Sequence, residues 1–249
     1  LKLEEEKPSV APKCDPSENW GKSIIQAFKL TLQAGGWILK TPFALVIILA
    51  GLMFDNCIRM VLTLGSQYYR LINLPEASFG LIGSGLAMLG LVIPWLAYKM
   101  VTRHSPAYNL AVMAMVSIIG LIGITFFFPI IGLLPVVLLS VVMYMGRFFQ
   151  SHYLNHITAS HQRATVLSFK GLSFNLAYGL IGILFSILLV FLRAQLAASH
   201  PDLSRAGIEN LVFIKSIGWF PWYFLVTLVA LLAVARWQLQ NTDVYKTPG

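Results

Sequence analysis

The sequence predicts an all-α integral membrane protein with six transmembrane helices. Two observations predict this class: only 11% of the 249 residues are charged while 57% are apolar, and long uncharged runs separate the charged residues. An average soluble domain is roughly 25% charged. The composition therefore excludes a soluble enzyme domain, a disordered tail and a nucleic-acid-binding protein as first interpretations, despite the net charge of +8.

The uncharged runs have the length of membrane spans. A helix needs about 20 residues to cross the hydrocarbon layer, and a charged residue at its centre costs at least ~2.5 kcal/mol. Three uncharged runs of 22, 22 and 20 residues cover 77–98, 171–192 and 216–235. Each is long enough for one span.

Two further regions complete the set of six. The run 104–146 has 43 uncharged residues and is interrupted by Pro129 and Pro135, so it predicts two helices rather than one. The region 41–69 predicts one span that carries Asp55 and Arg59. The predicted spans are 42–66, 79–98, 107–127, 133–150, 167–192 and 216–236.

Six spans place both termini on the same side of the membrane. The Lys and Arg residues are distributed unevenly, with thirteen on the terminal side and four in the opposite loops. The positive-inside rule therefore predicts cytoplasmic termini. The basic balance then reflects topology and contact with the anionic lipid bilayer.

The remaining segments are short. We expect a flexible cytoplasmic linker at 1–19 and a cytoplasmic tail at 238–249, around a bundle that occupies 37–237. Residues 20–36 predict an interfacial amphipathic helix ended by Gly35 and Gly36, because Trp20, Ile24, Phe28 and Leu32 recur at four-residue spacing. A short surface helix is expected within the outer loop 193–215. Since the chain opens with Leu1, we also expect it to be part of a longer protein.

Asp55 and Arg59 are the main candidate functional residues. They are four residues apart in the first span, on one helix face and in the order that pairs well. Ionisable groups inside a membrane usually face a water-filled cavity or a partner. The functional interpretation is proton coupling or contact with substrate at Asp55, Arg59 and the neighbouring Asn56. The alternative is that the two charges only neutralise each other for insertion.

Other polar residues lie within or at the edges of spans. Gln67, Asn175 and Tyr178 could line a substrate path, although hydrogen bonding between helices is the commoner use of such groups. His152 and His156 have the spacing of metal ligands but lack an obvious third ligand. We therefore predict no metal site and no cofactor, and no catalytic motif supports an enzyme.

The stretch 147–168 carries a family resemblance. It contains Arg147, then Tyr-Leu-Asn ending at Asn155, then Arg-Ala-Thr-Val-Leu-Ser beginning at Arg163. This pattern resembles the loop between helices ten and eleven of bacterial major facilitator superfamily transporters. The resemblance implies the C-terminal six-helix half of a twelve-helix transporter, built as a three-plus-three inverted repeat in the bacterial cytoplasmic (inner) membrane. It also implies that Arg147, Asn155 and Arg163 act at a cytoplasmic gate or at helix ends.

One departure from the family pattern is clear. In the loop 97–106, Lys99 and Arg103 are present, but the acidic partner of the family's loop motif is missing. The inner-gate ion pair of the family is therefore not carried over to this loop.

The resemblance implies a secondary active transporter half that moves a small solute by alternating access, with efflux slightly favoured over uptake, and Asp55 adds the expectation that transport is coupled to protons or another ion. Its partners would be the missing N-terminal six-helix half and the small-molecule substrate, with no nucleic acid. The alternative is a non-transporting six-span scaffold or assembly partner. An integral-membrane enzyme is the third possibility, and no cluster of acid, base and nucleophile supports it.

Overall fold

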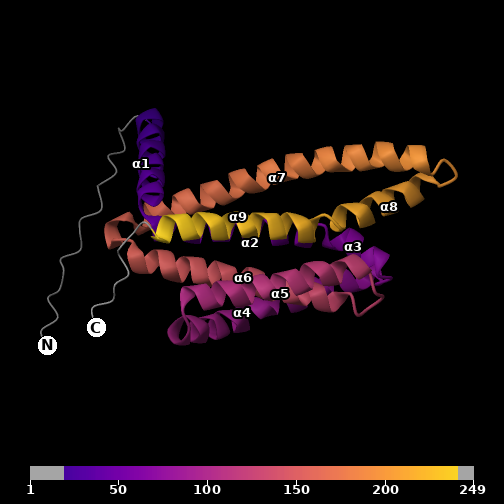
Figure 1. Ribbon diagram of the computed structural model, residues 1–249, viewed down its shortest axis with the longest axis horizontal. Coiled ribbons are helices and arrows are strands. Elements are labelled where there is room, and N and C mark those ends of the chain that lie inside the picture. Colours follow the sequence, from indigo (N-terminus) through magenta and orange to yellow (C-terminus); the bar gives the residue numbers. More distant parts are fainter. Residues whose placement is uncertain (1–19, 241–249) are drawn as a thin grey trace, which may run out of the picture.

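The computed structural model describes residues 20–240, and this part of the chain is helical without any strand. Six stretches in it are long and apolar enough to cross a membrane. Their long helices run side by side (Figure 1). The prediction of a helical membrane protein with six spans is therefore confirmed, whereas the linker 1–19 and residues 241–249 of the tail lie outside the described residues. The long helices are α2 (Pro42–Thr63), α4 (Phe79–Arg103), α5 (Pro106–Gly123), α6 (Leu133–Ile157), α7 (Arg163–Ser199) and α9 (Phe220–Gln240).

Three further helices accompany these six. They are α1 (Trp20–Lys40), α3 (Gly65–Leu71) and α8 (Arg205–Ile217), and single 3-10 turns occur at Glu76–Ser78, Ile124–Phe126 and Ser160–Gln162. The helix α3 follows α2 after a break at Leu64, so the first span ends at Thr63 rather than at residue 66.

Several helices are longer than the uncharged runs that predicted them. The helix α6 continues to Ile157 instead of ending at residue 150, and α7 covers 163–199 instead of 167–192. A charge limits how far a helix is buried in lipid, but it does not end the helix, since Arg and Lys are good helix formers. The ends follow local signals instead: α7 stops before Pro201, and Ser105 caps α5 by accepting the backbone N–H of Tyr108.

The outer loop predicted at 193–215 is mostly helical. Arg193 lies within α7, and α8 follows as an antiparallel return to α9 (Figure 1). The guanidinium of Arg193 donates two hydrogen bonds to the carboxylate of Glu209, at 2.7 and 2.9 Å. The pair α7–α8 extends beyond the ends of the other long helices as a helical hairpin.

The predicted break between the third and fourth spans is confirmed. Phe127 and Ile130 have positive φ angles of 49° and 61°, a region that non-glycine residues rarely adopt. The helix α5 ends at Gly123 and α6 begins at Leu133, so this strained turn joins two antiparallel spans.

The helix α1 runs across the end of the bundle instead of along it (Figure 1). It continues through Gly35 and Gly36 to Lys40, so the prediction that these glycines end it is wrong. A Cβ atom at Gly35 would lie 2.5 Å from the Phe169 ring; the residue therefore serves the close approach of α1 to α7. The chain turns at Thr41, which is extended because Pro42 follows it.

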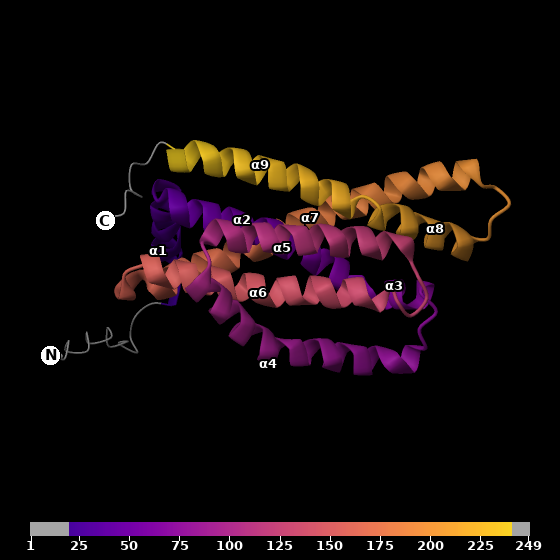
Figure 2. The same ribbon diagram turned by 60° about the horizontal axis from the view of Figure 1, so that its bottom comes forward.

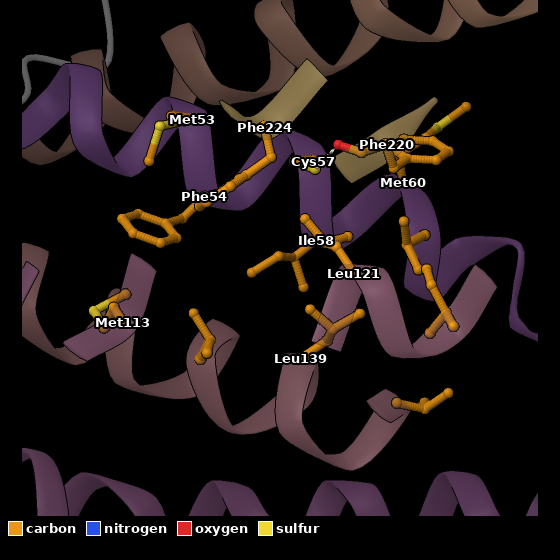
Figure 3. Packing of buried hydrophobic residues seen from close by; sticks show 14 of the residues in the cluster. Met53, Phe54, Cys57, Ile58, Met60, Met113, Leu121, Leu139, Phe220 and Phe224 are labelled. Carbon is orange, nitrogen blue, oxygen red and sulfur yellow. Dashed lines mark hydrogen bonds between the residues drawn. The ribbon is translucent and has the colours of Figure 1, made fainter. Parts of the chain in front are cut away.

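The helix α2 is the centre of the bundle. It packs against α6, α7 and α9, and α6 in turn packs against α4 and α5. Figure 3 shows the largest core around α2, where Phe54 meets Phe224 of α9 with ring centroids 5.5 Å apart. The thiol of Cys57 donates a hydrogen bond to the carbonyl oxygen of Phe220, 3.9 Å away. Burial of these residues fixes which faces of α2 point inward.

The opposite sides of the bundle are apolar and open. The helices α4 and α7 leave most of their side chains exposed, and Figure 2 shows α4 on the outer edge of the bundle, next to α6. In water such surfaces would associate, but in a bilayer they contact lipid tails or another helical bundle. The exposed faces thus agree with a membrane environment.

Candidate functional site

The ion pair predicted in the first span is formed. The Arg59 guanidinium contacts the Asp55 carboxylate one turn earlier on α2. The Asp55 side chain is 6% exposed and that of Arg59 is 24% exposed. Asp55 lies thirteen residues after the start of α2, which is roughly 20 Å along the helix axis. The pair is therefore deep within the span, and the carboxylate is its more buried member.

The helix α7 supplies the next contacts. The Nη1 atom of Arg59 donates to Oδ1 of Asn175 at 3.3 Å. The same guanidinium lies 4.9 Å from the centroid of the Tyr178 ring, within the range of a cation–π interaction. Asn175 and Tyr178, predicted separately from Arg59, thus meet it across the α2–α7 interface.

Thr63 closes the network. The Tyr178 hydroxyl donates to Thr63 Oγ1 at 3.0 Å, and the Thr63 hydroxyl donates to the backbone oxygen of Arg59 at 2.8 Å. Sequence reasoning missed Thr63, although its position four residues after Arg59 places both on one face of α2. The arrangement holds the guanidinium between a carboxylate, an amide and an aromatic ring.

Lys170 is the second residue that sequence reasoning missed. It was assigned to the terminal side because of its charge, but it lies seven residues into α7, with its ammonium 5.8 Å from the Phe174 ring. Phe174 of α7 and Gln150 of α6 both lie against Gly51 of α2, which brings Lys170 to the side of α2 where it interacts electrostatically with Asp55 and with Arg147 of α6. Lys170, Phe174 and Tyr178 recur at four-residue spacing, which puts them on one face of α7, and this signal could have identified Lys170 from the sequence.

Asn56 and Gln67 do not join this cluster. Asn56 is 4% exposed and faces a groove between α2 and α9, lined also by Tyr223 and Thr227. Gln67 of α3 donates from Nε2 to Oδ1 of Asn210 on α8, at 3.1 Å. Adjacent helix residues point about 100° apart, so Asn56 leaves the face that Asp55 occupies.

The three residues of the resembling stretch lie at different levels. Arg147 is exposed in the middle of α6, ten residues before the helix ends, and is not at a helix end. Asn155 is half-buried near that end, and within the part of the chain that the structure describes it has no hydrogen-bond partner. Arg163 begins α7 and donates from Nε to the carbonyl oxygen of Thr158, at 3.1 Å. That bond joins the start of α7 to the residue that caps α6.

A groove between α2 and α7 begins beside the charged cluster. It has a volume of about 890 Å³, and Thr63 and Tyr178 belong to its wall. The rest of the wall is mainly apolar. Met60 and Leu64 contribute to it from the α2 side, and the other residues come from one face of α7, where a Cβ atom added at Gly179 or Gly182 would meet nothing within 4 Å. The groove thus offers an apolar surface that starts at a charged centre.

Among the described residues, no group of three or more His, Cys, Asp or Glu residues could hold a metal ion. Comparisons with models of protein families, with curated proteins and with solved structures find no match to this chain. The functional interpretation therefore depends on the geometry of the cluster and the groove.

Proposed function

We propose that this chain is one six-helix half of a secondary active transporter of the major facilitator type, which moves a small solute by alternating access. The observation that carries the proposal is the contact of Arg59 with Asp55, Asn175 and Tyr178, deep within the first and fifth spans. A charged pair inside a membrane segment is costly, and such groups commonly mark substrate or ion pathways. The contacts with Asn175 and Tyr178 connect the pair on α2 to α7, so a change in the pair can alter how these two helices are held together.

The packing of the spans supports the three-plus-three interpretation. An inverted repeat would relate α2 to α6, α4 to α7 and α5 to α9. If the two units are equivalent, each helix contact has a counterpart in which every helix is replaced by its related helix. The counterpart of the α5–α6 contact is the α9–α2 contact, and the counterpart of the α4–α6 contact is the α7–α2 contact. All four contacts are present, and the pairs α2–α6 and α5–α9 map onto themselves. These larger contacts support the proposal of two equivalent three-helix units.

The groove supports a substrate path. In transporters of this type the substrate site lies near the midplane, between two helical bundles. The groove between α2 and α7 begins at Tyr178 and Thr63 and is open along its length. A second bundle would cover it and convert it into a closed passage, with the Arg59 cluster at one end.

We also propose that both ends of the described chain face the cytoplasm. The helix α1 and the end of α9 lie at the same end of the bundle (Figure 1). Phe28 and Leu32 of α1 are exposed, as is Lys29 between them, which suits a helix at the membrane surface. With the excess of Lys and Arg on the terminal side, this end is proposed to face the bacterial cytoplasm.

The mechanism we propose uses Asp55 as the proton carrier. When Asp55 is ionised, it holds Arg59; when it takes up a proton, the attraction is lost and Arg59 is left with Asn175 and Tyr178. A change in protonation then alters the strength of the α2–α7 contact. This links the proton to a movement of helices, as coupling requires.

The test is solute uptake into proteoliposomes, with and without a pH gradient, over a panel of solutes. Asp55→Asn is expected to abolish gradient-driven transport while the protein still folds in detergent. Asp202→Asn, an exposed aspartate in the turn between α7 and α8, is the matched control and should transport normally. Unchanged uptake and an unchanged pH profile in Asp55→Asn would reject the coupling role. Absence of any solute uptake would favour the alternative, a six-span scaffold or assembly partner.

A further inference from the structure

The charges near Asp55 do not balance. Four charged side chains come from three helices that meet here: Asp55 and Arg59 form a pair on α2, Arg147 is on α6 and Lys170 is on α7. Gln150, one turn after Arg147, and Phe174, one turn after Lys170, both lie against Gly51, one turn before Asp55, and Lys170 interacts electrostatically with Asp55 and Arg147. Only one of the four is a carboxylate, so the cluster carries a net charge of +2 when all four are ionised. Two cations in this cluster therefore have no anionic partner among the described residues.

These cations lie inside the helices rather than at their ends. Lys170 is seven residues from the start of α7, and Arg147 is ten residues from the end of α6. At about 1.5 Å per residue, this places their backbones roughly 10 to 15 Å from the helix ends. Lys170 is half-buried and Arg147 is exposed, and neither has an anionic partner among the described residues, so both remain able to bind an anion.

The cluster also retains free hydrogen-bond donors. The two terminal nitrogens of Arg59 bind Asp55 and Asn175, while its Nε–H is buried and has no partner among the described residues. In the same part of the chain, neither the Lys170 ammonium nor the Arg147 guanidinium takes part in a hydrogen bond or an ion pair. All of these donors would suit an acceptor that carries negative charge.

We propose that the solute is an organic anion, whose carboxylate or phosphate group binds between Arg59, Lys170 and Arg147. Its apolar part lies in the α2–α7 groove, which starts at Tyr178 and is lined mainly by apolar side chains. The proposal rests on the transport function proposed above and specifies its substrate class. An arginine fork is well suited to carboxylate and phosphate oxygens, and lysine adds a point charge.

The test compares probes that share an apolar part and differ in charge. Binding of benzoate, phenyl phosphate, benzyl alcohol and benzylamine is measured by calorimetry on the purified protein in nanodiscs. The two anions are expected to bind at least about 10-fold more tightly than the alcohol and the amine. Lys170→Gln and Arg147→Gln should each weaken anion binding about 10- to 100-fold, the loss of a charge-assisted hydrogen bond. Lys170→Arg should retain binding.

The control is Arg70→Gln, which removes an arginine from an exposed ion pair with Glu76, outside the cluster; it should leave anion binding unchanged. Equal binding of all four probes, no binding of either anion, or anion binding that neither cluster substitution weakens would overturn the proposal. If the cations instead pair with a carboxylate of another protein segment, the anions fail to bind and both substitutions destabilise the protein, which also overturns it.

Two results separate this inference from the transport function. Uptake of neutral or cationic solutes only, unaffected by Lys170→Gln, would reject the anion and leave the transport proposal standing. Anion binding that depends on Lys170 and Arg147, without uptake of any solute into proteoliposomes, would retain the anion site and reject transport.

Discussion

The Arg59 guanidinium lies 4.9 Å from the centroid of the Tyr178 ring, and the Tyr178 hydroxyl donates to Thr63 one turn further along α2. One aromatic side chain of α7 therefore contacts two positions of α2: its ring face lies against a cation, and its hydroxyl group donates a hydrogen bond. The two interactions can be removed one at a time.

Tyr178→Phe removes the hydroxyl and keeps the ring. We expect a loss of about 0.6 kcal/mol in the free energy of unfolding, the average for hydrogen bonds between membrane helices. Tyr178→Leu removes the ring as well, and the lost cation–π contact should add about 0.5 to 1 kcal/mol. Thermal unfolding in detergent measures both. Equal losses in the two variants would show that the ring face contributes nothing.

Arg59→Gln leaves Asp55 buried without its cation. Breaking a buried pair typically costs about 3 to 5 kcal/mol, so this variant should be strongly destabilised. Asp55→Asn with Arg59→Gln removes both charges and should be more stable than Arg59→Gln alone. The comparison is a double-mutant cycle in detergent. Additive losses would mean that the two side chains do not depend on each other.

The sequence predicted the Asp55–Arg59 pair and the six spans because both depend on local spacing and composition. It also marked Asn175 and Tyr178 as polar groups in a span, but which helix they face depends on tertiary packing. Lys170 was placed by its charge, and only the fold shows it close to Asp55. Asn56 shows the opposite case. It was included in the predicted site because it is next to Asp55 in the sequence, but packing directs its side chain away from the cluster.

Helix ends were predicted less well than helix positions. Arg147 and Arg193 bound the uncharged runs, yet α6 and α7 continue past them. Hydropathy reports where lipid ends, whereas helix ends depend on caps, prolines and contacts beyond the membrane. Gly35 illustrates the same limit. The sequence alone does not distinguish a glycine that ends a helix from one that leaves room for a neighbouring side chain such as Phe169.

Tyr68 lies in α3, after the end of the first span, and donates from its hydroxyl to the carbonyl oxygen of Gly132 at 3.0 Å. Burial raises the pKa of Tyr68 from 10.0 to about 12. The unfolded chain therefore loses this proton first as the pH rises, so stability is retained below pH 10 and falls between about pH 10 and 12. Unfolding in detergent across this range should show the loss.

Tyr68→Phe is the matched variant for this pH dependence. It should lower stability by about 1 kcal/mol at neutral pH, because a buried hydrogen bond is lost. Its stability should also fall less steeply above pH 10, although not by the full amount, since burial raises the pKa of Tyr69 too. An equally steep fall in the variant would assign the alkaline transition to other groups.

Gly51 and Gly182 provide a steric test of the bundle and of the groove. A Cβ atom at Gly51 would lie 2.5 Å from the Gln150 amide and 2.7 Å from the Phe174 ring, whereas one at Gly182 would meet nothing within 4 Å. Gly51→Ala should therefore force α2, α6 and α7 apart and cost about 1 to 3 kcal/mol, as overpacking does. Gly182→Ala should unfold at the temperature of the unmodified protein or slightly above it, because the position is open and alanine is the better helix former.

A larger side chain at Gly182 separates stability from transport. Gly182→Leu should fold normally, because the position faces the open groove, and it should reduce uptake of solute in proteoliposomes by filling that groove. Gly36→Leu is the matched control, since Gly36 is also open but lies on α1. Normal uptake by Gly182→Leu would remove the groove from the substrate path, while a large loss of stability in the same variant would show that α7 packs against α2 more closely there.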